Sequence, residues 1–246
     1  FLFSATIRVQ EVIVGYELYK ATHDPLALGL VGLAEAIPFI ITSLFGGYVA
    51  DQKNKITIMH ISLVVILMGS GILYTAFQPG IYSILSEWQH LAVSYAVFGL
   101  IGFAKGFYSP AASSLKPFLV PRTIYHNSST WSSSFSQAGA IVGPAAAGFM
   151  YAYLGLTHTL LIVIVNFLVC WILLGLIKTR PEFPKIVTPM MESLKEGFKF
   201  VFKTRIVLYA MTLDLFSVLF GGVIALLPIF AEDILKVGPE GLGLLR

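Results

Sequence analysis

The chain has 246 residues, of which 57% are hydrophobic and 12% are charged, and its formal net charge is +3. A soluble domain typically carries about 25% charged residues, so this chain has too few to cover a water-soluble surface. Its basic residues are spread over several short connections, which argues against a nucleic-acid partner. The single cysteine, Cys170, cannot form an intrachain disulfide. The composition predicts an all-α membrane protein.

A helix needs about 20 apolar residues to cross the hydrocarbon core of a bilayer. Seven stretches of the chain reach that length, and an eighth begins near Gly241. In chain order the seven run over residues 1–20, 26–49, 56–77, 90–112, 128–153, 157–177 and 206–230. Helix-breaking residues such as Pro25, Pro79 and Gly155 lie between them. We therefore expect a polytopic bundle.

The connection at residues 178–205 is the longest. Within it, residues 190–203 mix apolar and charged residues in a way that is typical of an amphipathic helix lying at the membrane surface. We expect three parts: a six-helix half at 1–177 with a truncated first helix, a cytoplasmic linker at 178–205, and the start of a second half at 206–246.

The basic residues are distributed unequally between the two sides of the predicted bundle. Two of them, Lys20 and Lys236, lie in the connections after odd-numbered stretches. Eleven lie in the connections after even-numbered stretches: Lys53, Lys55, Lys116, Arg122, Lys178, Arg180, Lys185, Lys195, Lys199, Lys203 and Arg205. Because basic loops stay in the cytoplasm, this bias predicts that the even-numbered connections are cytoplasmic.

A short repeat supports two related halves. Residues 25–30 open the second stretch and residues 239–244 open the eighth, and four of the six positions are identical at an offset of 214 residues (239 minus 25). This offset is expected if the seventh and eighth stretches restart the pattern of the first two, as in transporters built from parallel repeats. It also predicts that one or two turns of the first helix lie upstream of Phe1.

The turn between the second and third stretches, residues 47–55, resembles the signature of the major facilitator superfamily. Gly47 and Asp51 match it, and Lys55 matches in charge. The resemblance implies that Gly47 permits close helix packing, that Asp51 caps or pairs across a helix end, and that Lys55 holds a cytoplasmic gate. Gln52 and Asn54 depart from the signature, although Asn54 could still adopt a left-handed turn. A solvated turn is the alternative.

Residues 139–148 in the fifth stretch resemble the antiporter signature of the same family. Gly139, Gly143, Pro144 and Gly148 match, while Ala147 replaces a glycine. Small residues at a spacing of four let two helix backbones touch. Pro144 removes one backbone hydrogen bond, which favours a bend. A purely structural role for these residues is the alternative.

The resemblance extends along the chain, and residues 106–111 and 119–122 are similar to the exporter branch that includes enterobactin-exporter-like and drug-efflux proteins. It implies the major facilitator fold, with the N-terminal six-helix half, helix 7 and the start of helix 8. It also implies a multi-pass protein of the plasma membrane, the inner membrane in a bacterium.

Ionisable residues at membrane depth are costly and therefore point to function or pairing. Five residues in the predicted helices are candidates for such roles: Arg8, Glu11, Glu35, Lys105 and Asp214. The resemblance implies that helices one, four and seven line a central cavity. It thereby places Arg8, Glu11, Lys105 and Asp214 near that cavity. Glu35 lies on a helical face with small residues, which indicates a packed face.

We hypothesise that Glu35 or Glu11 exchanges a proton. Burial favours the neutral acid and a nearby Arg8 favours the carboxylate, so alternating contact with Arg8 could switch protonation. In the alternative, these residues form a permanent structural network and Lys105 extends toward the cytoplasmic surface.

These observations favour a secondary active transporter, specifically a proton-coupled exporter of a small organic molecule that works by alternating access in the lipid bilayer. A membrane-embedded lipid-modifying enzyme and a non-transporting scaffold are the alternatives. The five histidines lack metal-ligand spacing, and no glycine-rich phosphate loop occurs in the sequence. We therefore expect no metal, no cofactor and no nucleotide-driven pump in this chain.

Overall fold

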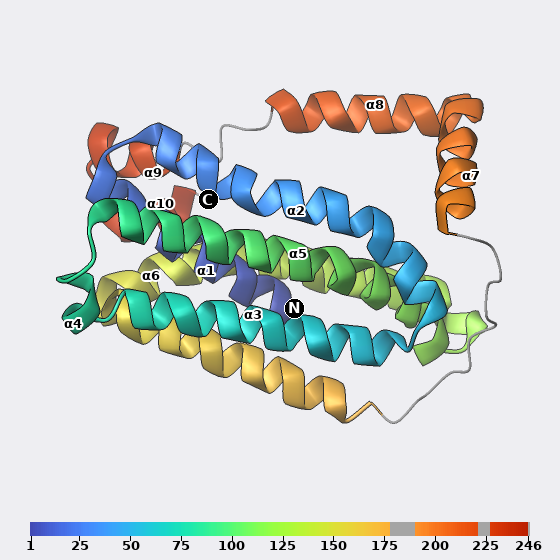
Figure 1. Ribbon diagram of the computed structural model, residues 1–246, viewed down its shortest axis with the longest axis horizontal. Helices are drawn as coiled ribbons and strands as arrows, with labels where there is room; N and C mark the ends of the chain where they lie inside the picture. Colours follow the sequence, from blue (N-terminus) through green and yellow to red (C-terminus); the bar gives the residue numbers. More distant parts are fainter. Residues whose placement is uncertain (178–189, 221–226, 246) are drawn as a thin grey trace.

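The computed structural model describes residues 1–177, 190–220 and 227–245, and these residues form helices and no strand. The longer helices run side by side as a bundle (Figure 1). In chain order the elements are α1 (Leu2–Thr22), α2 (Pro25–Gln52), α3 (Lys55–Ala76), α4 (Pro79–Tyr82), α5 (Glu87–Leu119), a 3-10 turn (Arg122–Ile124), α6 (Tyr125–Gly175), α7 (Met190–Lys203), α8 (Arg205–Phe220), α9 (Leu227–Ile229), a π-helical turn (Phe230–Ile234) and α10 (Gly238–Leu245).

Among the described residues, four helices are long and apolar enough to cross a membrane: α2, α3, α5 and α6. The 51 residues of α6 include one non-helical residue, Gly155, with φ 74° and ψ 174°. The two stretches predicted on either side of Gly155 are therefore two helices that meet at this residue, as expected.

The predicted first span is present as the 21-residue helix α1, although α1 is not among the four helices that are apolar enough to cross a membrane. Four charged residues lower its hydropathy. Its side chains are nevertheless deeply buried, with Ile13, Val14 and Leu18 each at most 1% exposed. An internal helix faces its neighbours more than lipid, so it can carry charges that lipid-facing helices cannot.

The C-terminal part of the chain is described only in part. α7 covers the same residues as the predicted amphipathic helix. α8 and α9 lie within or next to the predicted seventh stretch, while residues 178–189 and 221–226 of the predicted linker and seventh stretch lie outside the described residues. The proposed division into three parts stays a prediction.

Two short polar residues start the second and third helices. Asp24 accepts a hydrogen bond from the Leu26 amide at 2.9 Å. Asn54 accepts from the amides of Ile56 and Thr57 at 3.0 and 3.4 Å. The left-handed turn considered for Asn54 was wrong, because its backbone is extended (φ −63°, ψ 114°) while its side chain caps α3.

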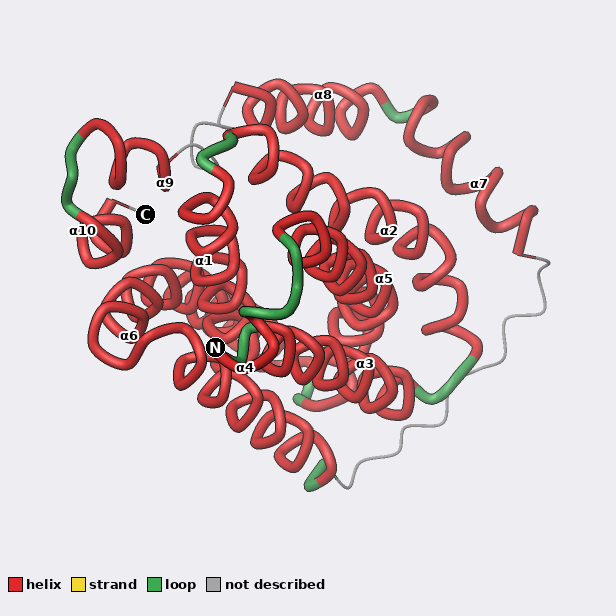
Figure 2. Tube along the Cα trace, turned by 60° about the vertical axis from the view of Figure 1, so that its left-hand side comes forward, coloured by secondary structure: helices red, strands yellow, loops and turns green. Residues whose placement is uncertain are grey.

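The closest helix packing joins α2 and α5, which lie alongside each other in Figures 1 and 2. A Cβ atom on Gly102 would lie 2.9 Å from the backbone carbonyl carbon of Glu35. A Cβ on Gly106 would lie 2.9 Å from the Cβ of Thr42. Thr42 also donates a hydrogen bond across the interface to the Phe103 carbonyl at 3.3 Å. Glycine is required here because the backbones touch.

The antiporter-like segment packs α6 against α1. A Cβ on Gly139 would lie 3.0 Å from the Phe1 carbonyl oxygen, and one on Gly143 would lie 2.9 Å from the Arg8 Cβ. The close approach predicted from this segment is therefore present. Gly148 instead contacts α10, and the backbone stays helical through Pro144. The break in α6 lies at Gly155.

We predict that Gly102→Ala lowers the stability of the purified protein by about 1–3 kcal/mol, because the added methyl group has to displace the Glu35 backbone. Gly71→Ala is the matched control, since a Cβ at Gly71 meets no atom within 4 Å. Alanine also favours the helix, so this control is expected to be neutral or stabilising. Thermal unfolding in detergent measures both, and equal midpoints for the two variants would contradict the close contact.

Candidate functional site

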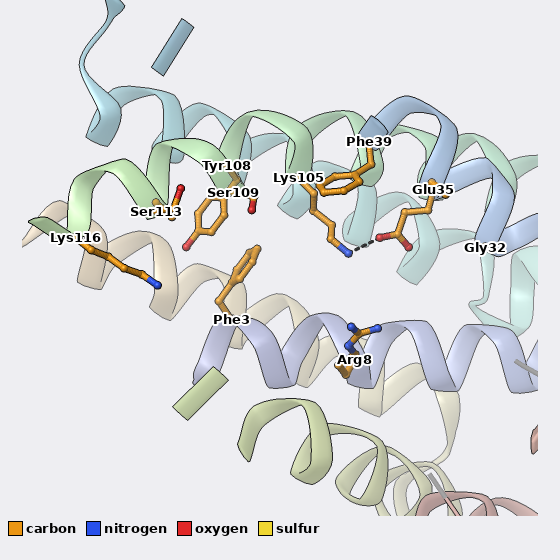
Figure 3. Close-up of a pocket in the computed structure, with 12 residues that line it drawn as sticks. Phe3, Arg8, Gly32, Glu35, Phe39, Lys105, Tyr108, Ser109, Ser113 and Lys116 are labelled. Carbon is orange, nitrogen blue, oxygen red and sulfur yellow. Dashed lines mark hydrogen bonds and ion pairs between the residues drawn. The ribbon is translucent and has the colours of Figure 1, made fainter. Parts of the chain in front are cut away.

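Four ionisable side chains from three helices meet inside the bundle and form what we call the charge cluster: Arg8 and Glu11 from α1, Glu35 from α2 and Lys105 from α5. Arg8 Nη1 lies 2.8 Å from Glu11 Oε2. Lys105 Nζ lies 3.3 Å from Glu11 Oε1 and forms a second ion pair with Glu35 (Figure 3). The charges thus alternate in sign, and their formal sum is zero.

The cluster is largely removed from solvent. The side chains of Glu11 and Glu35 are each 15% exposed and that of Lys105 is 23% exposed, whereas Arg8 is 47% exposed. Burying a charge is costly unless an opposite charge and hydrogen bonds compensate it. The alternating arrangement supplies that compensation, and it also makes each charge depend on its neighbours.

Glycine contacts set the positions of these side chains. Gly102 holds the α2 backbone at Glu35 directly against α5. Lys105 follows Gly102 by three residues and so projects from nearly the same face of α5, where its amine reaches the Glu35 carboxylate. On the other side of the site, Gly143 of α6 packs on the Cβ of Arg8.

The partner of Glu35 differs from the expected one. The sequence hypothesis paired either Glu35 or Glu11 with Arg8. In the structure Arg8 pairs with Glu11, as one of the two options had it, whereas Glu35 pairs with Lys105. The alternative in which Lys105 extends toward the cytoplasmic surface is also wrong, because both of its carboxylate partners lie inside the bundle. A separation of 70 residues between Glu35 and Lys105 leaves no local pattern that could reveal this pair.

The structure does not bring Asp214 to the charge cluster. Asp214 is exposed on α8, which packs chiefly against α7. Figure 1 shows α8 beyond α2, on the far side from α1 and α5. The expected position of Asp214 beside the cavity was therefore wrong, because it relied on the place of helix 7 in the family fold and not on a contact of this residue.

Two cavities meet at the charge cluster. The large cavity has a volume of about 560 Å³ and extends from Glu35 to Lys116 near the end of α5 (Figure 3). Its lining includes the aromatic rings of Phe3, Phe39 and Tyr108 and the hydroxyls of Ser109 and Ser113.

The small cavity, about 270 Å³, extends the other way to Leu28 and Pro228. Arg8, Glu35 and Lys105 line both cavities. The cluster therefore forms the boundary between a cavity on the predicted cytoplasmic side and one on the opposite side.

In the turn that resembles the family signature, the close helix contact is made by a different glycine from the one expected. A Cβ on Gly47 would meet no atom within 4 Å, whereas one on Gly46 would overlap the Gly106 carbonyl oxygen. The close packing assigned to Gly47 therefore belongs to Gly46. One residue turns a helix by about 100°, so this shift moves the contact to a different face.

Two charged residues of this turn have different surroundings. Asp51 is exposed, whereas Lys55 is buried and donates a hydrogen bond to the Ala50 carbonyl at 2.8 Å. The Lys55 amine also lies 5.9 Å from the centre of the Phe118 ring. Lys55 thus connects the α2–α3 turn to the end of α5, while its role in a gate stays a prediction.

Two of the histidines, His60 and His90, pack against aromatic rings. The His90 ring stacks on Phe77 and lies against Tyr82, and His60 contacts Trp171 edge-on. Within the described ranges, no group of three His, Cys, Asp or Glu side chains could hold a metal ion. The ionisable chemistry of the site therefore lies in carboxylates and amines.

Comparison with known proteins gives low but extensive similarity to exporters. The chain is 28% identical over 216 residues to the Multidrug resistance protein MdtG of Klebsiella pneumoniae (strain 342), covering 82% of this chain and 47% of that protein. It is 23% identical over 217 residues to the Multidrug efflux pump Tap of Mycolicibacterium fortuitum, covering 82% and 51%. It is 23% identical over 148 residues to the Macrolide efflux protein A of Streptococcus pyogenes, covering 60% and 35%.

The chain spans about half the length or less of these curated relatives. The sequence model of the Major Facilitator Superfamily matches residues 1–245, nearly the whole chain. This match, the apolar helices and the efflux relatives together favour a transporter over the alternative of a membrane-embedded enzyme. The chain belongs to the major facilitator superfamily of multi-pass membrane transporters.

Proposed function

We propose that the complete protein is a proton-coupled secondary exporter of small organic molecules that works by alternating access. The observation that carries this proposal is the charge cluster at the boundary of two cavities. The names of the relatives add support, since they describe multidrug efflux, macrolide efflux and multidrug resistance. The proposed location is the plasma membrane, the inner membrane in a bacterium.

Glu35 is the proposed proton carrier. Its carboxylate is largely removed from solvent and forms an ion pair with Lys105. A proton on Glu35 would replace Lys105 as the neutralising partner, and the cluster would then carry one surplus positive charge. Lys105 would keep Glu11 as its remaining partner, and Glu11 already binds Arg8. A surplus charge in a poorly solvated site is costly, so protonation favours a rearrangement of α1, α2 and α5.

The large cavity is the proposed substrate site. Its volume of about 560 Å³ lies within the usual range for small-molecule pockets. The rings of Phe3, Phe39 and Tyr108 offer flat apolar contacts, and two serines and the charged residues offer polar ones. This lining suits an amphipathic organic molecule with an aromatic part. It also places the substrate in contact with Glu35 and Lys105, so substrate and proton can act on the same ion pair.

Two further sets of residues receive proposed roles. Lys55, fixed to the end of α5 as well as to the α2–α3 turn, is suited to hold the predicted cytoplasmic end closed, with Asp51 beside it. Gly139 and Gly143 keep α6 against α1 next to Arg8, so movement of α6 would be transmitted to the charge cluster. A non-transporting scaffold, the alternative function, would not need a charge cluster between two cavities.

We predict that Glu35→Gln in the complete transporter reduces proton-driven substrate transport at least about tenfold, because the amide cannot exchange a proton. Transport is measured in liposomes with an imposed proton gradient. Substrate exchange without a gradient is expected to persist, since the amide preserves the shape of the cavity. Glu11→Gln is expected to have the smaller effect of the two, because Glu11 still has Arg8 in the protonated cluster.

Asp214→Asn is the matched control, because it removes one exposed carboxylate outside the charge cluster. It is expected to leave the dependence on the gradient unchanged. Full gradient-driven transport in both Glu35→Gln and Glu11→Gln would refute the proposed coupling.

We also predict that the single variant Lys105→Met is less stable than the double variant Lys105→Met/Glu35→Gln. The single change leaves a buried carboxylate without its amine, which costs about 1–3 kcal/mol, whereas the double change removes that charge as well. Thermal unfolding of the purified variants in detergent gives the order. A double variant no more stable than the single would mean that the two residues do not form a pair.

A further inference from the structure

A second polar cluster lies at the end of the bundle opposite Lys116. It consists of three tyrosine–carboxylate hydrogen bonds, which we call the tyrosine contacts. Tyr16 donates to Glu232 at 2.5 Å, Tyr19 donates to Asp233, and Tyr151 donates to Glu17.

The tyrosine rings of these contacts are packed into the core. Tyr16 and Tyr19 are 4% and 2% exposed. The Tyr16 ring packs edge-on against Tyr151 at 5.1 Å. The three contacts therefore form one connected set that joins α1, α6 and the π-helical turn.

Two of the contacts cross between parts of the chain that are more than 200 residues apart. Tyr16 and Tyr19 belong to α1, whereas Glu232 and Asp233 belong to the π-helical turn Phe230–Ile234. Figure 1 shows α9 at the same end of the bundle as the turn between α1 and α2. Because the contacts run through two hydroxyl groups, they can be broken without disturbing the packing of either ring.

The segment held by these contacts covers the small cavity. Pro228 of α9 is buried and lines that cavity together with Val12, Gly15 and Leu28. The π-helical turn follows α9 directly, so hydrogen bonds to Glu232 and Asp233 also hold Pro228 in place. At its far end the small cavity is bounded by Glu11, Glu35 and Lys105.

We propose that Tyr16 and Tyr19 are positioning residues that hold residues 227–234 over the small cavity and so close the outer route to the charge cluster. This inference rests on the proposed transport function and adds its outer closure. Hydrogen bonds from hydroxyls to carboxylates are strong, yet they exchange readily with water. In the outward-open state these hydroxyls and carboxylates are solvated, Pro228 moves off the cavity, and water reaches Glu11 and Glu35.

Tyr151 and Glu17 have a supporting part. Their contact joins α6 to α1 within the same half of the bundle, so it does not bridge to residues 227–234. It fixes the Tyr151 ring against Tyr16 and thereby orients the Tyr16 hydroxyl. A loss of this contact is expected to weaken the closure less than a loss of the Tyr16 and Tyr19 hydroxyls.

The test measures access to the small cavity from outside. In the complete transporter, Cys170→Ser removes the cysteine of this chain, any others are replaced likewise, and Val12→Cys places a reporter on the small cavity. Intact cells are treated with a membrane-impermeant maleimide. We expect Tyr16→Phe/Tyr19→Phe to raise the labelling rate at position 12 about tenfold, the shift that follows when hydrogen bonds to charged groups are lost from the closed state.

Matched controls separate closure from a general loosening. Tyr82→Phe removes a hydroxyl from a tyrosine that lies in α4 and outside the tyrosine contacts, and it is expected to leave labelling unchanged. A second reporter, Ser113→Cys in the large cavity, is expected not to gain labelling from outside, because the closure proposed here acts on the other cavity.

Glu232→Gln/Asp233→Asn removes the acceptor charges and keeps both tyrosines, so it is expected to raise labelling at position 12 in the same direction. This variant also tests the proposal if the tyrosine double variant does not fold. Unchanged labelling in the folded variants would overturn the proposal. Labelling needs neither substrate nor a proton gradient, so this result is independent of whether Glu35→Gln loses transport.

Discussion

The direct backbone contact between α2 and α5 is the constraint on which the rest of the site depends. Gly102 has no side chain, so the Glu35 backbone can lie against α5. Lys105 then projects from α5 at the correct height to reach the Glu35 carboxylate. A side chain at Gly102 would separate the helices and leave two buried charges without each other. Charge compensation in this bundle therefore depends directly on helix packing.

The same contact is the basis of the proposed coupling to a proton. The charge cluster is neutral as a whole, and each of its members has an opposite charge beside it. A change of one charge removes this balance in a place where water cannot easily restore it. Since Arg8, Glu35 and Lys105 line both cavities, the imbalance acts on the boundary between them. The tyrosine contacts hold residues 227–234, of which Pro228 lines the small cavity, and the proposed closure acts there.

Several interpretations from the sequence rested on local spacing, and these agree best with the structure. The apolar lengths located the helices, Gly155 marked the break within α6, and the spacing of Gly139 and Gly143 predicted a close helix contact. The glycines at 99, 102 and 106 repeat at intervals of three and four, which is the signal that could have revealed the α2–α5 contact. By contrast, the helix contact assigned to Gly47 is made by the preceding residue, Gly46. A family motif names a residue type and not the helix face that the residue occupies.

The sequence by itself determined that the protein lies in a lipid bilayer and where its helices approximately run. It also identified the ionisable residues that need partners. These features follow from hydropathy and helix period, which are local properties. Only the tertiary structure decided which residues pair with these ionisable side chains. It paired Glu35 with Lys105 and not with Arg8, left Asp214 exposed on α8, and brought Tyr16 and Tyr19 to Glu232 and Asp233. Such pairs join residues 70 or more positions apart, and their formation depends on how helices approach and rotate, which no local pattern encodes.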